Sequence, residues 1–136
     1  MAMILYAAGI LIGASAARNA NTNLVSAINN LFAVFIPLII VIPALSKKTF
    51  TSQKYGVLMA VLGGIVISLF VLALNKSFTQ NKVGVVAPVV FGGAILISTV
   101  LSYFIFKEKI DGIETVGLVL VLAGLGFLIY ARAIVK

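Results

Sequence analysis

The chain has 136 residues, of which 62% are hydrophobic and 10% are charged, and its mean hydropathy is +1.25. A soluble domain carries about 25% charged residues, so this composition excludes a water-soluble globule. The chain has no Cys and no His, so it offers no disulfide framework, no thiol nucleophile, no imidazole base and none of the usual nitrogen or sulfur ligands of zinc or iron. We expect no metal, no cofactor, no catalytic residues and no enzymatic activity. The net charge of +7 comes from scattered basic residues, a pattern that disfavours nucleic-acid binding.

Polar residues divide the chain into five continuous apolar segments. Each predicts a helix that crosses the membrane, since roughly 20 residues span a hydrocarbon core of about 30 Å. The predicted helices cover residues 2–18, 24–45, 55–74, 83–106 and 113–131. Short links make consecutive helices antiparallel. We therefore predict one transmembrane domain over residues 1–136, an all-α, multi-pass bundle in the cell membrane.

The first segment is short for a span. It either crosses with Arg18 extending to the far interface or lies partly in the membrane surface. Ala14, Ser15 and Ala16 resemble a signal-peptide cleavage site, but the segment lacks a basic leading region and is followed by another apolar segment. We predict that the segment is retained.

Three prolines fall within the predicted helices, Pro37 and Pro43 in the second and Pro88 in the fourth. Proline removes a backbone hydrogen bond, so we expect kinks at these positions. Such kinks either line a cavity or reflect how common proline is in membrane helices.

Lysine and arginine in short loops set the orientation of a membrane protein. With five crossings, one side carries Lys47, Lys48, Lys54, Lys107 and Lys109, and the other carries Arg18, Lys76, Lys82, Arg132 and Lys136. This five-to-five split predicts insertion in both orientations and an antiparallel homodimer with its twofold axis in the membrane plane. The alternative is a weakly biased protein that a partner or its first helix orients.

The acids, Glu108, Asp111 and Glu114, gather near the start of the last predicted helix. There they favour the helix dipole, so we expect a structural role. No Asp, Glu, Lys or His lies in the middle of an apolar segment, which argues against proton coupling and against binding of cationic drugs.

Amides and hydroxyls are the polar groups that remain within the apolar segments. On a continuous helix one stripe contains Asn19, Asn23, Ser26 and Asn30, with Thr22 and Asn29 on its flank. Lipid-exposed amides are costly, so the stripe either lines a wet cavity or bonds neighbouring helices. Arg18, at its head, is either the partner of an anionic group such as a carboxylate or an interfacial anchor.

The fourth predicted helix carries a stripe of small and hydroxyl side chains that includes Ser98 and Ser102, and Ser68 adds one hydroxyl to the third. These groups suit a neutral or zwitterionic solute, although such hydroxyls can also bond their own backbone. The candidate substrate-binding residues are Ser15, Arg18, Asn19, Asn23, Ser26, Asn30, Ser68, Ser98 and Ser102.

Short motifs in this chain resemble the EamA-like repeat of the drug/metabolite transporter superfamily. They are Val-Gly-Val-Val-Ala-Pro-Val-Val at 83–90, Phe-Lys-Glu-Lys-Ile at 106–110, Gly117 with Leu-Ala-Gly at 122–124, and Leu-Ile-Gly-Ala-Ser at 11–15. The chain departs from the repeat at Lys107, where glycine is usual, and lacks the common Trp of the first helix.

In that superfamily most members carry two five-helix repeats in inverted orientation around a central pathway. The resemblance implies that this chain, with one repeat, pairs with an inverted copy. We therefore expect a half-size transporter that moves a small neutral or zwitterionic metabolite, such as an amino acid, by alternating access. The chain is also distantly similar to small multidrug resistance proteins, but their first-helix glutamate has no counterpart here.

Two rivals to a homodimeric transporter stay open at this point. One is a non-transporting or heterodimeric membrane subunit, as in the paired lipid-carrier flippases of the same superfamily. The other is a single repeat that folds and dimerises without a selected cargo.

Overall fold

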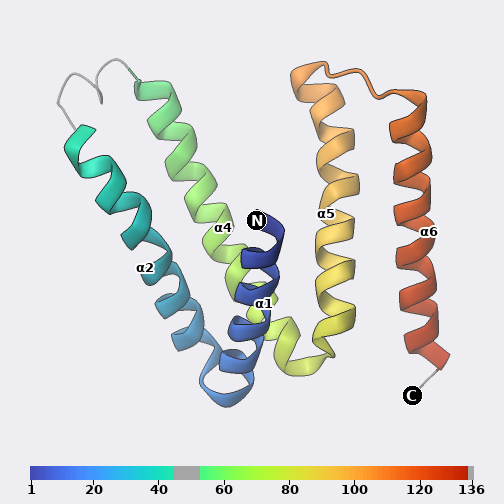
Figure 1. Cartoon of the computed structure of the whole chain (residues 1–136), viewed down its shortest axis with the longest axis horizontal. Coiled ribbons are helices and arrows are strands. Elements are labelled where there is room, and N and C mark those ends of the chain that lie inside the picture. The colour runs from blue at the N-terminus through green and yellow to red at the C-terminus, as the bar shows by residue number, and fades with distance from the viewer. Residues whose placement is uncertain (45–52, 135–136) are drawn as a thin grey trace. The chain divides into compact units, whose positions relative to one another are not determined.

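The structure, a computed structural model, describes residues 1–44 and 53–134 (Figure 1). Its helices are α1 (Ala2–Asn19), α2 (Thr22–Val41), the 3-10 helix η1 (Ile42–Ala44), α4 (Lys54–Gln80), α5 (Val83–Phe106) and α6 (Gly112–Ile134). Each of the five α-helices is long and apolar enough to cross a membrane. The described residues form no strand, so the predicted all-α class with five candidate spans is confirmed.

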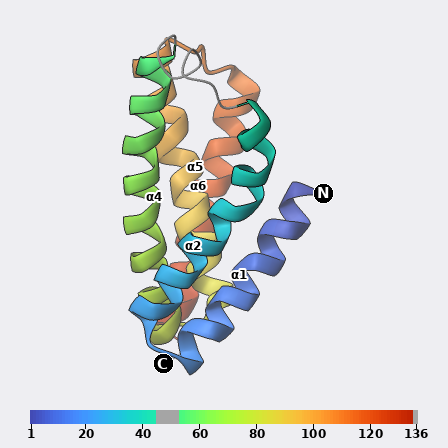
Figure 2. The same cartoon turned by 90° about the vertical axis from the view of Figure 1, so that its left-hand side faces the viewer.

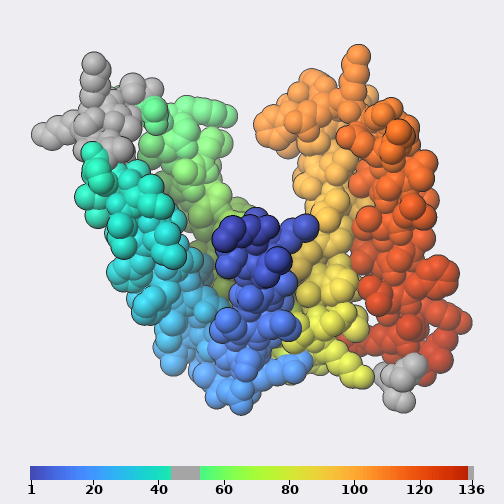
Figure 3. All heavy atoms as spheres, in the orientation of Figure 1, coloured from blue at the N-terminus to red at the C-terminus, as the bar shows by residue number. Residues whose placement is uncertain are grey.

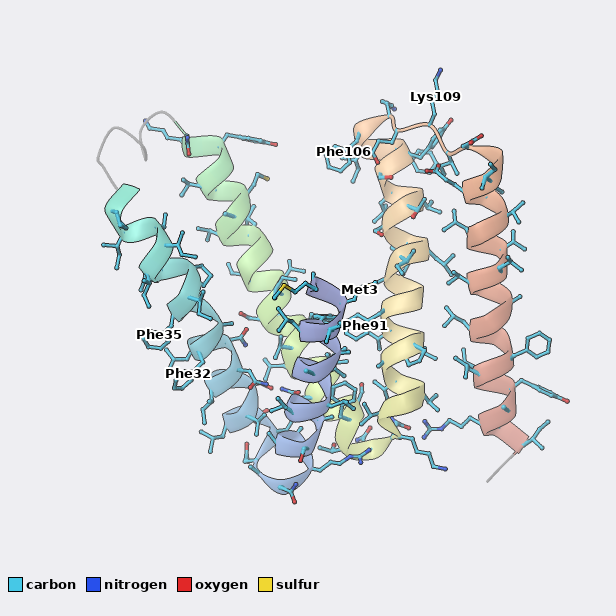
Figure 4. All side chains as sticks on the ribbon, viewed as in Figure 1. Met3, Phe32, Phe35, Phe91, Phe106 and Lys109 are labelled. Atoms are coloured by element: carbon cyan, nitrogen blue, oxygen red, sulfur yellow. The ribbon has the colours of Figure 1, made fainter. Side chains whose placement is uncertain are left out.

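Most large apolar side chains point away from the rest of the chain. Ile36 is 72% exposed and Phe127 is 74% exposed, and Phe32 and Phe35 project from the outer side of α2 (Figure 4). Lipid tails are as apolar as leucine, so these side chains have no driving force to be buried in protein. The exposed apolar surface is the one expected of helices surrounded by lipid.

The chain divides into two compact units, Met1–Gln80 and Asn81–Lys136. In the first unit α1, α2 and α4 pack on one another. Figure 1 and Figure 2 show that α1 and α2 meet at their connecting turn, and in Figure 1 the two helices diverge towards the N-terminal end of α1. The second unit is a hairpin of α5 and α6. Both units therefore consist of neighbouring helices joined by short connections.

The turn between α1 and α2 interrupts the polar stripe that the sequence predicted. Ala20 is extended, and the side-chain oxygen of Asn21 accepts hydrogen bonds from the backbone N–H groups of Asn23 (3.0 Å) and Leu24 (3.2 Å). This is an N-cap, so a new helix begins here. The continuous helix assumed for the stripe is therefore wrong, because Asn19 belongs to α1 and the other stripe residues to α2.

The α-helical part of α2 ends earlier than predicted. It stops at Val41, and Pro43 lies in the 3-10 helix that follows. Pro43 has no N–H to donate to the carbonyl of Ile39, so the α-helix ends here and the predicted kink at Pro43 is wrong. The prolines at 37 and 88 do lie within α2 and α5. Leu45, Lys47 and Lys48 lie outside the described residues.

In contrast, α4 is longer than predicted. The sequence assigned residues 75–82 to a connector, but the helix continues to Gln80. No proline or glycine interrupts this stretch, and its inward face is buried, with Asn75 3% and Phe78 1% exposed. Packing of that face extends the helix by more than one turn and brings Asn75 into the interior of the first unit.

Hydrogen bonds fix both ends of the α5–α6 hairpin. Asp111 begins α6: its side chain accepts a hydrogen bond from the N–H of Gly112 (2.6 Å), and its own N–H donates to the carboxylate of Glu114 (2.9 Å). The bond from Asp111 to Glu114 is one half of a capping box, and the acids lie at the start of α6, where the sequence predicted that they favour the helix dipole. At the other end Arg132 donates to the side-chain oxygen of Asn81.

Lys107 ends α5 in a strained conformation. It has φ 59° and ψ 27°, and among the described residues it is the only non-glycine residue with positive φ. An L side chain crowds the following carbonyl in this left-handed region, which is why helices commonly end there with glycine. The geometry agrees with the resemblance noted above, in which the similar repeat usually has glycine at this position.

We expect Lys107→Gly to raise the free energy of unfolding by about 1 kcal/mol, because glycine relieves this strain. Chemical unfolding in detergent micelles measures the change. Lys109→Gly is the matched control, since it removes the same side chain from a connector residue without positive φ. A lower stability for Lys107→Gly than for the wild type would contradict this account.

Candidate substrate pocket

The first unit contains an open pocket of about 340 Å³ between α1, α2 and α4. Apolar side chains form most of its wall, and its polar side chains are Tyr6, Asn29 and Asn75. No charged residue lines it. An apolar concavity with a few polar groups is the usual form of a small-molecule site.

Small residues on α1 and α2 create the space. Gly9 and Gly13 lie one turn apart on α1, and Ala33 lies opposite on α2. A Cβ on Gly9 would meet nothing within 4 Å, and one on Gly13 would lie 3.6 Å from Nδ2 of Asn29. The helix α1 has 18 residues against 27 in α4, and Figure 3 shows α1 reaching only part of the way along its unit. The pocket is therefore a wedge beside a short, glycine-containing helix.

Beneath the pocket, Ser26 joins α2 to α4. Its side chain is fully buried, donates a hydrogen bond to the carbonyl of Thr22 (2.8 Å) and accepts one from Nδ2 of Asn75 (2.8 Å). Asn30 donates to the carbonyl of Ser26 (2.9 Å). Buried polar groups need such partners. Of the two roles predicted for the stripe, Ser26 therefore has the helix-bonding one, and through it Asn75 is held in place.

Arg18 ties the ends of α1 and α4 together. Its Nε donates to the carbonyl oxygen of Phe78 at 3.1 Å. That carbonyl lies in the last turn of α4, where carbonyl groups lack a donor within the helix. Arg18 does not line the pocket. The contact links two helices of the first unit, and both roles predicted for Arg18, the partner of an anionic group and the interfacial anchor, stay predictions.

Three further predicted residues of the first unit lie on other surfaces. Ser15 and Asn19 are exposed on a shallow face of α1, where Asn19 donates to the carbonyl of Ser15 (2.8 Å). Asn23 is exposed in a separate open pocket that Lys76 also lines. Ser68 is half-buried on α4. None of these residues lines the three-helix pocket.

The two remaining predicted residues, Ser98 and Ser102, lie on α5. Their hydroxyls donate to the carbonyls of Ile95 and Thr99, each at 3.0 Å. Ser102 also lines an open groove of the second unit near Glu108. The α5 hydroxyls are thus satisfied by their own backbone, the alternative that the sequence left open.

Sequence reasoning missed the polar residues of the pocket. Asn29 was placed on the flank of the stripe, Asn75 was assigned to a connector, and Tyr6 was not considered for binding. The available signal was the helical spacing of Val71, Asn75 and Phe78, four and then three residues apart. It continues the face of α4 beyond its predicted end.

The model of the EamA-like transporter family matches residues 1–130. No curated protein and no solved structure matches the chain. The match covers all of α1 to α5 and most of α6, and it agrees with the resemblance that the motifs had suggested. The chain is a multi-pass membrane protein that belongs to the EamA-like transporter family.

Proposed function

We propose that the chain is a half-size transporter that works as an antiparallel homodimer and moves a small neutral or zwitterionic metabolite, such as an amino acid, by alternating access. Family membership supports membrane transport. The main support for the antiparallel dimer is the distribution of the ten Lys and Arg residues. With five crossings, the two sides of the membrane carry five of them each. Without a bias, copies of both orientations coexist and can pair about a twofold axis.

The polar face of α1 supports a second protein surface beside it. Ser15 and Asn19 are exposed there, and polar side chains are more favourably placed against protein or water than against lipid. We propose that this face, with Ser68 and Asn23, lines the path between two copies. In this proposal Ser26 and Asn30 act from beneath by holding Asn75.

In the proposed path, smaller roles fall to Arg18, Ser98 and Ser102. Arg18 lies at the interfacial end of the path, where α1 and α4 end. Ser98 and Ser102 offer their hydroxyl lone pairs to a solute, because their protons are committed to the backbone.

Reconstitution tests the transport proposal directly. Purified chain in liposomes is expected to catalyse saturable uptake of at least one solute from a panel of neutral amino acids and neutral amides, since alternating access has a finite number of sites. Protein-free liposomes are the control. Folded, reconstituted chain that gives only non-saturable leakage across the whole panel would contradict transport. A single orientation with a different co-purifying chain would favour the heterodimeric alternative.

A further inference from the structure

We infer that the pocket between α1, α2 and α4 is a ligand site complete within one chain, and that it takes an uncharged, largely apolar solute with one hydrogen-bonding end. The inference rests on the proposed function only in treating this ligand as cargo. It narrows the cargo from neutral or zwitterionic to neutral. It also predicts one bound molecule per chain, and therefore two per homodimer.

The pocket lining indicates an uncharged ligand, because it contains no charged side chain among the residues that the structure describes. The lining residues, all within described parts of the chain, include no Asp, Glu, Lys or Arg. Moving an ion out of water costs several kcal/mol, and only an opposite charge or a full set of hydrogen bonds repays it. A carboxylate or an ammonium group would find neither in this wall. A neutral solute avoids that cost.

Asn29 is the pocket residue that would bind the hydrogen-bonding end of the ligand. It lies seven residues into α2, about 10 Å along the helix from Thr22. Within the described residues its carboxamide makes no hydrogen bond, although it lines the pocket. An amide at this depth needs a partner, because lipid offers none. A ligand carbonyl, amide or hydroxyl would provide one.

Asn75 offers a second, fixed contact point. Its Nδ2 donates to Ser26, and no other hydrogen bond is recorded for its side chain within the described residues. The side chain is nearly buried, yet no buried polar side-chain atom of the described chain lacks a partner. The Asn75 oxygen is therefore accessible, and the pocket is the surface it lines. Two carboxamides from neighbouring helices thus face the same space.

The size of the pocket fits a small solute. At about 340 Å³ it lies at the lower end of the range for ligand pockets, about 300–1,000 Å³. Leu5, Ile10 and Leu74 supply apolar wall. A short alkyl or aryl group with one amide or hydroxyl matches this lining.

Three probes of equal length test the charge rule: hexanamide, hexanoate and hexylammonium. Thermal unfolding and calorimetric titration of the purified chain in detergent report binding, because a ligand that binds only the folded state raises its stability. We expect hexanamide to raise the melting temperature with one molecule bound per chain. The two charged probes are expected to bind at least about tenfold more weakly.

Variants locate the site. Gly9→Leu is expected to abolish the hexanamide shift by filling the pocket, because the position has free space for a side chain. Asn29→Leu is expected to weaken hexanamide binding about tenfold by removing one hydrogen bond. The Asn29 carboxamide makes no hydrogen bond in the described part of the chain, so Asn29→Leu should fold and can test the site even if Gly9→Leu does not fold. Gln80→Leu, which removes an exposed carboxamide from α4 outside the pocket, is the matched control and should bind like the wild type.

Three results would overturn the inference: equal stabilisation by a charged probe, unchanged hexanamide binding in Asn29→Leu, or one molecule bound per two chains. Failure of the proposed function is separate. Hexanamide binding at one per chain without any solute flux supports the pocket and contradicts transport. Saturable flux that Gly9→Leu and Asn29→Leu leave unchanged supports transport and shows that the ligand of this pocket is not the cargo.

Discussion

Replacing Lys76 and Lys82 with glutamine is expected to fix the chain in one orientation and to abolish transport. The change leaves five cations on one side of the membrane and three on the other, from an even division in the wild type. The side richer in Lys and Arg then stays cytoplasmic. Chains of one orientation cannot form an antiparallel pair, so flux should fall to the level of empty membranes.

The mirror variant is Lys54→Gln with Lys109→Gln, which removes two cations from the opposite side. All four lysines are exposed, and Figure 4 shows Lys109 pointing away from α5 and α6, so little packing is lost. Each double variant alone is expected to be inactive, and co-expression of the two should restore flux, because together they supply both orientations. Wild-type flux from either double variant alone, in one fixed orientation, would refute the antiparallel dimer.

Phe78→Ala is expected to lower the free energy of unfolding by about 3 kcal/mol. Phe78 is 1% exposed, and its ring fills the junction of α1, α2 and α4 below the pocket. Removing a buried Phe side chain typically costs about 3–5 kcal/mol, and we expect the lower value because lipid tails are as apolar as the interior. Unfolding in mixed micelles with a denaturing detergent measures it.

Phe127→Ala is the matched control for that substitution. The Phe127 side chain is 74% exposed on α6, so the same truncation should change stability by less than about 0.5 kcal/mol. Phe78→Ala should also enlarge the pocket, because the Phe78 side chain lines it. Equal losses of stability in the two variants would show that Phe78 does not hold the three helices together.

Length and hydropathy are enough to predict the five membrane helices, because crossing a hydrocarbon core imposes a length on each apolar segment. They fail where polar residues continue a helix. The polar run that begins at Asn75 suggested a loop, but burial of Phe78 continues α4 through it. Whether a polar stretch ends a helix depends on a contact with another helix, which no local pattern contains.

The residues that line the pocket were also beyond what local sequence patterns predict. The predicted stripe included Asn19, which lies on a different helix from Asn23 and Ser26. The face of α2 that lines the pocket carries Asn29 and Ala33, and Asn29 is about 100° around the helix from Asn30. The amide that lines the pocket, Asn29, is thus the sequence neighbour of the predicted amide, Asn30. Which face of α2 borders the pocket depends on how α2 packs against α1 and α4, and the local sequence pattern does not contain that information.

Orientation of the chain in its native membrane tests the central claim most directly. The chain has no cysteine, so Lys109→Cys introduces a single thiol at the exposed α5–α6 connector. A membrane-impermeant maleimide, applied to intact cells and then to opened cells, measures the fraction of thiols on each face. Our account predicts substantial labelling from both faces, near one half each. Labelling from one face alone would contradict an inverted homodimer.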